Sequence, residues 1–248
     1  MESDSPVSGN ISGALQLWCA YPDDLLDANA AEACLALLSE EEQAHRHRLR
    51  LERSRREYLA THALARTALS SLRQVAPQDW RFVKNAHGKP ALSPDCGLRF
   101  NLSNTAGLAV CLVADAPADV GVDVEAQTRA AQAYGVAHRV FSAAEQAQLV
   151  ALSGPARLDR SLSLWMLKEA YVKARGIGIT LPLRGISFLF DEAGAVRLEL
   201  DPELEDDAAR WHFRLINHRG HRIAGMAERM NIDDLEMWEF RPPSARRI

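Results

Sequence analysis

The stretch SLWMLKEAYVKARGIG, residues 163–178, has the apolar spacing of an amphipathic helix. Trp165, Glu169 and Lys173 recur every four residues, so on a helix they share one face. A Glu–Lys pair on a helix is most often a surface ion pair worth about 0.3–0.5 kcal/mol. A Trp one turn earlier argues against a solvated face, because an exposed Trp is uncommon. This face is therefore a candidate for a functional site.

The pattern continues upstream and predicts a helix over 160–176. Gly176 and Gly178 are expected to end it, with Pro182 beyond them. Two of the chain's four lysines lie on this helix, although Lys and Arg together number 29. Because Lys is a compact point charge that can approach a phosphate, each lysine is a candidate for a role that Arg fills poorly.

A second informative stretch, ADVGVDVE at 118–125, alternates Val with polar or small residues and predicts a half-buried strand. Side chains at i and i+2 of a strand point to one face, so Asp123 and Glu125 lie together, opposite the valines. Two such carboxylates repel each other unless a cation lies between them, and oxygen ligands suit Mg²⁺ or Mn²⁺. The alternative is a solvated outer strand face. The functional hypothesis adds Glu169 as a third carboxylate on the same cation.

The rest of the pattern predicts further helices and strands. Helices are expected over 38–72, where Ser39 and Glu42 form a capping box, and over 141–152. Extended structure is expected in the remaining segments: 14–22, 80–92 with a turn at His87–Gly88, 98–114 with a break near 104–107, and a β-rich run from 186 onward with turns at 192–194 and 218–221.

The segments SEEEQA, 39–44, and SAAEQA, 142–147, share Ser-x-x-Glu-Gln-Ala, and each opens a helical region that strands follow. A capping box is common enough to recur by chance. The shared order of a helix and then hairpins favours a duplicated α+β unit with its join near 115–120.

The composition indicates an ordinary globular chain. Its 248 residues suffice for one large domain or two of about 120 residues. The net charge of −4 gives no nucleic-acid or membrane signal, and no apolar run approaches the about 18 residues of a membrane span. The acidic N-terminus is unlike a signal peptide, and residues 1–12 are expected to be disordered. Four cysteines without CxxC spacing are interpreted as reduced, mostly buried thiols of a cytoplasmic protein.

Three further stretches are candidates for anion binding. GKP at 88–90 brings backbone and Lys89 together but lacks the pattern of a P-loop. FNLSNT at 100–105 ends in small polar side chains, for which an ordinary turn is the commoner meaning. The segment 45–56 holds six Arg and one Glu, as expected of a solvated helix face or of a surface for phosphates. Together with the carboxylates, these residues predict a site for a pyrophosphate-containing nucleotide and a divalent cation.

VGVDVE followed by LWMLKEAYVKARGIGI closely resembles the two signature motifs of the 4′-phosphopantetheinyl transferases, (I/V)G(I/V)D and W-x-x-K-E-(A/S)-x-x-K. GKP, FNLSNT and VFSAAE resemble auxiliary motifs of the family, so the resemblance covers about residues 38–190. It is closest to the Sfp-type branch, which is monomeric with pseudo-two-fold symmetry. The implied α+β fold has two similar halves, each a small, mostly antiparallel sheet packed with a long helix. The half 13–117 would contact the coenzyme A nucleotide, and 118–248 would hold the metal and catalytic residues.

The resemblance implies transfer of the 4′-phosphopantetheine arm of coenzyme A to a serine of an apo acyl or peptidyl carrier protein, with release of adenosine 3′,5′-bisphosphate. Mg²⁺, or Mn²⁺, would be held by Asp123, Glu125 and Glu169. Asp123 also belongs to the implied catalytic set, in which Glu169 is the base for the serine hydroxyl and Lys173 contacts the attacked phosphate. The implied coenzyme A contacts are Arg48, Arg56, Lys89, Ser103, Asn104, Lys168 and Lys173.

This sequence departs from the family pattern at Asn104, where the family usually has His. Asn donates a hydrogen bond but carries no charge, so weaker coenzyme A binding is expected. The family's helix arginine matches either Arg56 or Glu57.

Other functions stay open at this point. A nucleic-acid-binding module would use the segment 45–56, but a pI of about 6.1 and the absence of a known reader motif weigh against it. A metal-dependent nucleotide phosphohydrolase would use the same carboxylates. A catalytically inactive member would only bind carrier proteins. We expect a monomer without a nucleic-acid or membrane partner.

Overall fold

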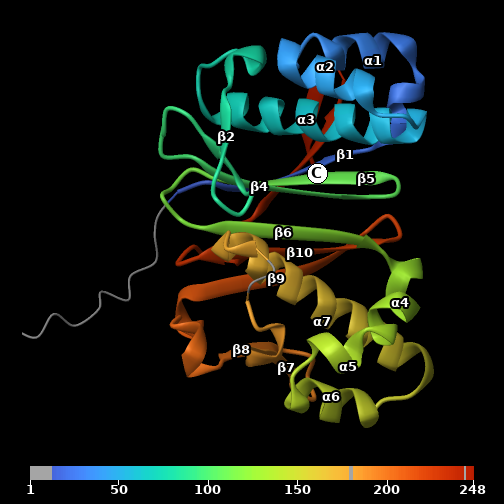
Figure 1. Cartoon of the computed structure of the whole chain (residues 1–248), viewed down its shortest axis with the longest axis vertical. Coiled ribbons are helices and arrows are strands. Elements are labelled where there is room, and N and C mark those ends of the chain that lie inside the picture. Colours follow the sequence, from blue (N-terminus) through green and yellow to red (C-terminus); the bar gives the residue numbers. More distant parts are fainter. Residues whose placement is uncertain (1–12, 179–180, 243) are drawn as a thin grey trace, which may run out of the picture.

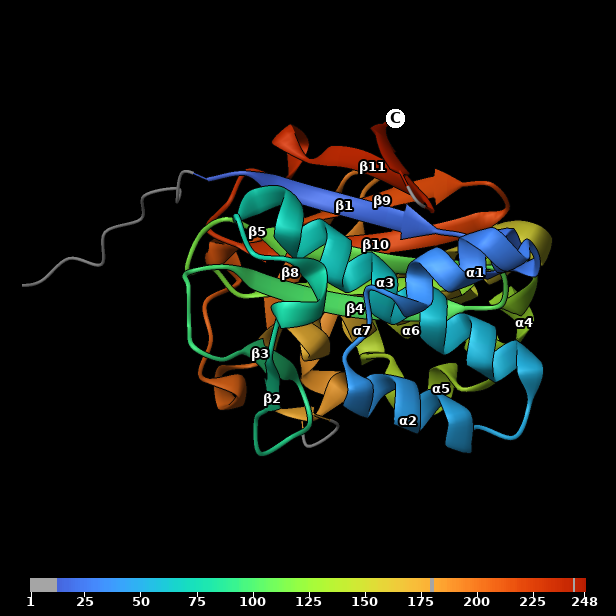
Figure 2. The same cartoon turned by 90° about the horizontal axis from the view of Figure 1, so that it is seen from above.

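The computed structural model describes residues 13–178, 181–242 and 244–248. The expected disorder of residues 1–12 therefore lies outside the described residues. Two sheets lie face to face at the centre, and a long helix covers the outer face of each sheet (Figures 1 and 2). This arrangement of layers is the α+β fold that the sequence predicts.

The first half follows the predicted order of a strand, helices and two hairpins. Its elements are β1 (Leu15–Ala20), α1 (Ala28–Leu35), α2 (Glu40–Arg48), α3 (Glu52–Leu72), β2 (Phe82–Lys84), β3 (Pro90–Leu92), β4 (Arg99–Thr105) and β5 (Leu108–Ala114). The predicted helix over 38–72 is interrupted because the backbone is extended at Leu49 and Leu51. Helix α1 was not predicted.

The second half repeats this order and then adds two strands. Its elements are β6 (Val120–Ala126), α4 (Ala130–Gly135), α5 (Ala137–Val140), α6 (Ala143–Val150), α7 (Gly154–Arg175), β7 (Ile186–Phe190), β8 (Val196–Leu200), β9 (Trp211–His218), β10 (His221–Glu228), β11 (Glu236–Arg241) and β12 (Ser244–Arg247). Helix α7 begins before the predicted 160, with a Pro in its first turn, and ends at Gly176 as predicted. The short helices α4 and α5 were not predicted.

The two central sheets share one strand order. Strands β1, β5 and β4 lie side by side and antiparallel, and β6, β10 and β9 do the same. Strand β11 then pairs parallel to β1, and β12 extends that sheet at its edge. The shared order supports the duplicated unit. The rotation relating the halves and the boundary at 117/118 stay predictions.

Both predicted capping boxes are formed, and each leads to a matching buried ion pair. Glu42 of the first box lies 2.7 Å from Nε of Arg66 on α3. Glu145 of the second lies 2.8 Å from Nζ of Lys168 on α7. Each half therefore ties its capping helix to its long helix through one ion pair.

The apolar core forms three layers, one between the sheets and one under each long helix. Strand β1 shows how the alternation serves two layers. Leu15, Leu17 and Cys19 pack between the sheets, whereas Trp18 and Ala20 pack toward α3. Among the described helices, none combines the length and apolar composition that a membrane crossing needs.

The cysteines contribute to these layers as thiols. All four are free, and Cys19, Cys34 and Cys111 are buried, as predicted. Burial raises the pKa of Cys19 and of Cys34 to about 12. These side chains therefore act as small apolar groups.

Strand β6 lies in direct backbone contact with α7. A Cβ added at Gly121 would lie 2.0 Å from the carbonyl oxygen of Ala170 and 2.5 Å from the backbone nitrogen of Ala174. The face of β6 that carries Asp123 is thus covered by the helix, and Asp123 is only 6% exposed. The alternative of a solvated outer strand face is wrong.

We expect Gly121→Ala to cost about 3 kcal/mol or more of unfolding free energy, because a methyl group there meets rigid helix backbone. Urea unfolding monitored by circular dichroism measures this loss. Gly225→Ala on the neighbouring strand is the control, since its Cβ would meet side chains only at 3.8 and 3.9 Å. Equal stability of the two variants would contradict the close approach.

Candidate functional site

Polar side chains of β4 bind the backbone of β6 across the gap between the sheets. Oδ1 of Asn101 accepts a hydrogen bond from the backbone nitrogen of Val122 at 2.9 Å. Oγ of Ser103 accepts one from the backbone nitrogen of Val124 at 3.3 Å. Ser103 is among the residues predicted from the sequence, whereas Asn101 is not. The signal was present in the alternation of FNLSNT, which places Asn101, Ser103 and Thr105 on one face.

Three predicted site residues meet at this gap. Nζ of Lys173 lies 2.6 Å from Oδ1 of Asp123 and donates a second hydrogen bond to Oγ of Ser103 at 2.9 Å. The hydroxyl of Ser103 donates in turn to the same Asp123 oxygen at 3.0 Å. The cluster joins β4 of the first half to β6 and α7 of the second.

The predicted face of α7 is present. Trp165, Glu169 and Lys173 are each half-buried, while the residues directly before and after each of them are buried. Helix α7 therefore buries the remainder of this segment and leaves one stripe open toward the cluster.

The other two predicted carboxylates, Glu125 and Glu169, both have raised pKa values, although Glu125 lies 3.5 Å from Nε of Arg129. Burial raises the pKa of Glu169, and repulsion from Asp123 raises it further, whereas Lys173 lowers it. Burial also raises the pKa of Glu125. The charge of Arg129 lowers this pKa, and the charge of Asp123 raises it. The three carboxylates are thus close enough to repel one another.

A divalent cation would remove this repulsion. Within residues 13–178, 181–242 and 244–248, no three His, Cys, Asp or Glu side chains are grouped closely enough to hold a metal ion. The ammonium of Lys173 binds Oδ1 of Asp123, while Oδ2 of Asp123 is buried without a hydrogen-bond partner among the described residues. An unpartnered carboxylate oxygen beside Glu125 and Glu169 is a hard oxygen donor, so the donor chemistry fits Mg²⁺. The ligand set would require side-chain movement.

Lys168 lies outside the cluster. The residue is 1% exposed, and Nζ is paired with Glu145. The same amine donates hydrogen bonds to the carbonyl oxygens of Leu183 and Ile186, in the segment that follows α7. Burial lowers its pKa, opposed by the charge of Glu145. Because all these contacts are internal, the structure offers no free ammonium here for the coenzyme A contact implied by resemblance.

Lys89 is also engaged with protein groups. Its Nζ donates to the carbonyl oxygen of Ala174 at 2.7 Å and to that of Val120 at 3.3 Å, and it lies 3.6 Å from Asp119. Burial lowers its pKa, with Asp119 opposing. The lysine of GKP therefore lies at the end of α7 and outside the Asp123 cluster.

The predicted contacts from the arginine-rich segment and from β4 differ in exposure. Arg48 and Asn104 are exposed, whereas Arg56 is half-buried. Nε of Arg56 is buried without a hydrogen-bond partner in the described part of the chain, and so is Nε of Arg46, which was not among the expected contacts. A buried guanidinium N–H without an acceptor is a candidate for anion binding.

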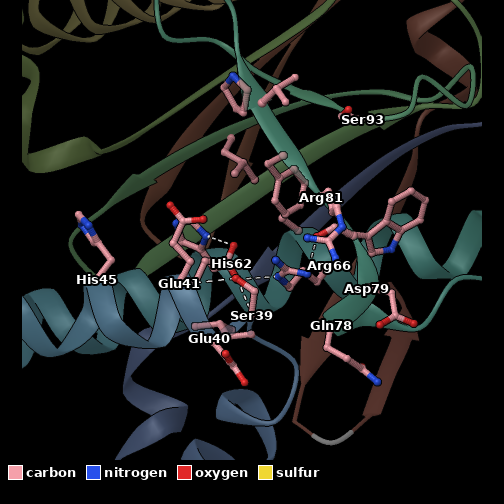
Figure 3. A pocket seen from close by; sticks show the side chains of 18 of the residues that line it. Ser39, Glu40, Glu41, His45, His62, Arg66, Gln78, Asp79, Arg81 and Ser93 are labelled. Carbon is pink, nitrogen blue, oxygen red and sulfur yellow. Dashed lines mark hydrogen bonds and ion pairs between the residues drawn. The ribbon is translucent and has the colours of Figure 1, made fainter.

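A cavity of about 1300 Å³ lies between α2, α3, β2 and β4. Figure 3 shows His45 at one end of it and Asp79 and Arg81 toward the other. Tyr58 forms part of its wall, with ring centroids 5.0 Å from His45 and 3.9 Å from His62. The lining includes Leu102 of β4, whose side chain packs on the α3 side of the sheet, opposite the face that carries Ser103.

Glu42 lies at this cavity. Burial alone would raise its pKa, but hydrogen bonds from His62 and Arg66 outweigh burial and lower the pKa to about 2. A lowered pKa means that folding favours the carboxylate. Its contribution to stability is therefore present above the unfolded-state value of 4.5 and is lost as the pH falls toward 2.

We expect the unfolding free energy of the wild type to fall steeply between about pH 5 and pH 2, and Glu42→Gln to flatten this acid limb. Urea unfolding at a series of pH values measures it. Glu41→Gln is the matched control because Glu41 is exposed one residue away. An acid limb in Glu42→Gln as steep as that of the control would contradict the assignment.

The chain resembles proteins of known class. The family model described as the 4′-phosphopantetheinyl transferase superfamily matches residues 119–226. The chain is 27% identical over 186 residues to the 4′-phosphopantetheinyl transferase Sfp of Bacillus subtilis, covering 75% of this chain and 81% of that one. It is 32% identical over 172 residues to the 4′-phosphopantetheinyl transferase HetI of a Nostoc species, covering 68% and 71%.

A solved holo-(acyl-carrier-protein) synthase from Bacillus anthracis, in complex with CoA (3′,5′-ADP), overlaps 44% of this chain and 94% of its own. The TM-score is 0.38 and the identity is 19%. A likeness at this level does not bear on the function.

Proposed function

The chain belongs to the 4′-phosphopantetheinyl transferase superfamily, and on that premise we propose that it transfers the 4′-phosphopantetheine arm of coenzyme A to a serine of an apo acyl or peptidyl carrier protein. The observation that carries the proposal is the convergence of Ser103, Asp123 and Lys173 beside Glu125 and Glu169. Such a set of carboxylates with one ammonium suits a pyrophosphate and a divalent cation.

In the proposed reaction the serine oxygen bonds to the phosphorus that carries pantetheine. The bond from that phosphorus to the bridging oxygen of the pyrophosphate breaks, and adenosine 3′,5′-bisphosphate leaves with the bonding electrons. The serine proton passes to Glu169, directly or through water. Burial and the charge of Asp123 raise the pKa of Glu169, which makes it a stronger base than an exposed carboxylate.

We assign the divalent cation, Mg²⁺ or Mn²⁺, to Asp123, Glu125 and Glu169. When bound, it would neutralise charge on the pyrophosphate. The unpartnered Oδ2 of Asp123 supports this assignment. Lys173 would then contact the attacked phosphate. Ser103 would keep its position between β6 and α7.

The nucleotide part of coenzyme A is assigned to the cavity between α2, α3, β2 and β4. Its aromatic wall of His45, Tyr58 and His62 suits a base. Arg46 and Arg56 are not part of the lining, and we propose that they supply phosphate contacts from the adjoining arginine-rich segment. The exposed Arg48 and Asn104 stay in the proposed set of contacts.

For Lys168 we propose a structural role in place of the coenzyme A contact, because its bonds are internal. The proposed setting is a monomer in the cytoplasm, and the free, buried cysteines fit a reducing compartment.

The deciding experiment incubates the protein with coenzyme A, Mg²⁺ and an apo carrier protein and then weighs the carrier by mass spectrometry. A mass gain of one phosphopantetheine arm, abolished by a chelator and restored by Mg²⁺ or Mn²⁺, is expected. Coenzyme A breakdown without a mass gain would indicate a phosphohydrolase instead. If coenzyme A stays intact and the carrier gains no mass, the protein would be a carrier-binding protein without transfer activity.

Lys173→Ala is expected to lower kcat for transfer about 100-fold or more, because it removes the ammonium that would stabilise charge at the reacting phosphate. Timed mass spectrometry of the carrier measures the rate. Arg197→Ala is the control, since Arg197 is an exposed cation of β8 that forms an ion pair with Glu199. A kcat in Lys173→Ala within a few-fold of the control would exclude the role.

Asn104→His is expected to lower the KM for coenzyme A, because a histidine at this exposed end of β4 adds a donor that can be charged. Initial rates at varied coenzyme A concentration measure the change. An unchanged or raised KM would refute a phosphate contact at this position.

A further inference from the structure

The turn between β2 and β3 is bonded to the C-terminal end of α7. Nδ2 of Asn85 donates a hydrogen bond to the carbonyl oxygen of Gly176 at 2.7 Å, across 91 residues of sequence. Next to it, Nζ of Lys89 donates to the carbonyl oxygen of Ala174 at 2.7 Å. A turn of the first half thus holds the helix of the second half that carries two of the proposed catalytic residues.

Asn85 also shapes the turn that presents these groups. Its Oδ1 accepts hydrogen bonds from the backbone nitrogens of His87 and Lys89, both at 2.9 Å. Its own backbone nitrogen donates to the carbonyl oxygen of Lys89 at 3.0 Å. One side chain therefore fixes the turn with its oxygen and binds the helix end with its nitrogen.

These contacts satisfy groups that a helix leaves free. The last four carbonyl groups of a helix have no partner within it. In α7 the backbone nitrogen of Gly176 bonds to the carbonyl oxygen of Val172, and Lys89 takes that of Ala174. A positive charge there also suits the partial negative charge of a helix C-terminus. Lys173 lies within this same turn.

The fit between the turn and the helix end leaves no spare room. Gly176 has a φ of +62°. A Cβ on it would lie 2.7 Å from Cδ of Lys89 and 3.3 Å from Nδ2 of Asn85. The glycine is therefore required both by the backbone conformation and by the closeness of the turn.

We propose that Asn85, with Lys89 beside it, is a positioning residue that acts through Lys173. By holding the last turn of α7 against the first half, it sets where the Lys173 ammonium meets Asp123 and Ser103. Catalytic geometry tolerates little error, since a misplacement of about 1 Å can cost on the order of 100-fold in rate. The inference rests on the proposed transfer reaction.

Asn85→Asp separates the two roles of the side chain. The carboxylate keeps both acceptor bonds that shape the turn, but it loses the donor to Gly176 and places negative charge at the helix C-terminus. We expect kcat to fall about tenfold or more, while the KM for coenzyme A stays within about threefold of the wild type. Thermal unfolding confirms that the variant is folded. A folded variant with wild-type kcat would overturn the proposal.

A double-mutant cycle shows whether the effect passes through Lys173. In a Lys173→Ala background, Asn85→Asp should change the remaining rate less than about twofold, because the group it positions is gone. Single-turnover mass spectrometry over long incubations measures such low rates. Independent, multiplicative losses in the double variant would overturn the proposal.

A glycine pair tests the same contact without touching Asn85. Gly176 and Gly194 both have positive φ, but a Cβ on Gly194 would meet no atom of the described residues within 4 Å. Gly176→Ala should lower kcat about tenfold or more, whereas Gly194→Ala, which also places Ala at a positive φ, should retain it. Equal activities would contradict the proposal.

The transfer activity of the wild-type protein distinguishes failure of the proposed function from failure of the positioning role. If the wild-type protein adds no arm to the carrier, the proposed function fails. If the wild type is active and the Asn85 and Gly176 variants match it, only the positioning role fails.

Discussion

The ion pair between Lys173 and Asp123 is the contact on which the site depends. Asp123 is nearly inaccessible to solvent, and a buried carboxylate is costly unless it is paired and hydrogen-bonded. Its Oδ1 is shared by Ser103 of β4 and Lys173 of α7, so elements of both halves converge on one oxygen. Within the part of the chain that the structure describes, the other oxygen has no hydrogen-bond partner. The halves therefore meet at a charge that is incompletely neutralised, which is the property that a cation site requires.

The backbone of β6 makes this arrangement possible. One edge of β6 pairs with β10, and along its other edge Asn101 and Ser103 of β4 supply side-chain acceptors where another strand would supply carbonyl groups. The two sheets thus come together without merging, and the gap between them is lined with polar groups. On the adjoining face, Gly121 lets α7 lie against the strand, which brings Lys173 within reach of Asp123.

Local signals in the sequence were sufficient for the strand at 118–125, the end of α7 at Gly176 and the capping boxes, because spacing and capping residues determine these features. Contacts between distant segments had no such signal. The helical spacing shows that Lys168 points away from Lys173. It does not show that Lys168 forms a buried ion pair with Glu145. GKP suggests an anion contact, whereas Lys89 binds the end of α7. The parallel pairing of β11 with β1 and the short helices α4 and α5 also lack a local pattern.

The repeated ion pairs align helix α3 with helix α7, and this alignment shows why the charged site of the second half has no counterpart in α3. Aligned on Arg66 and Lys168, the positions of α3 that correspond to Glu169 and Lys173 are Thr67 and Ser71. Both hydroxyls donate to carbonyl groups of their own helix, Thr67 at 2.9 Å and Ser71 at 2.7 Å, and neither carries charge. The first half thus keeps the buried pair that anchors its long helix but has no acid and ammonium one turn apart. It contributes a wall, a turn and a serine to the one site, whose carboxylates and ammonium come from the second half.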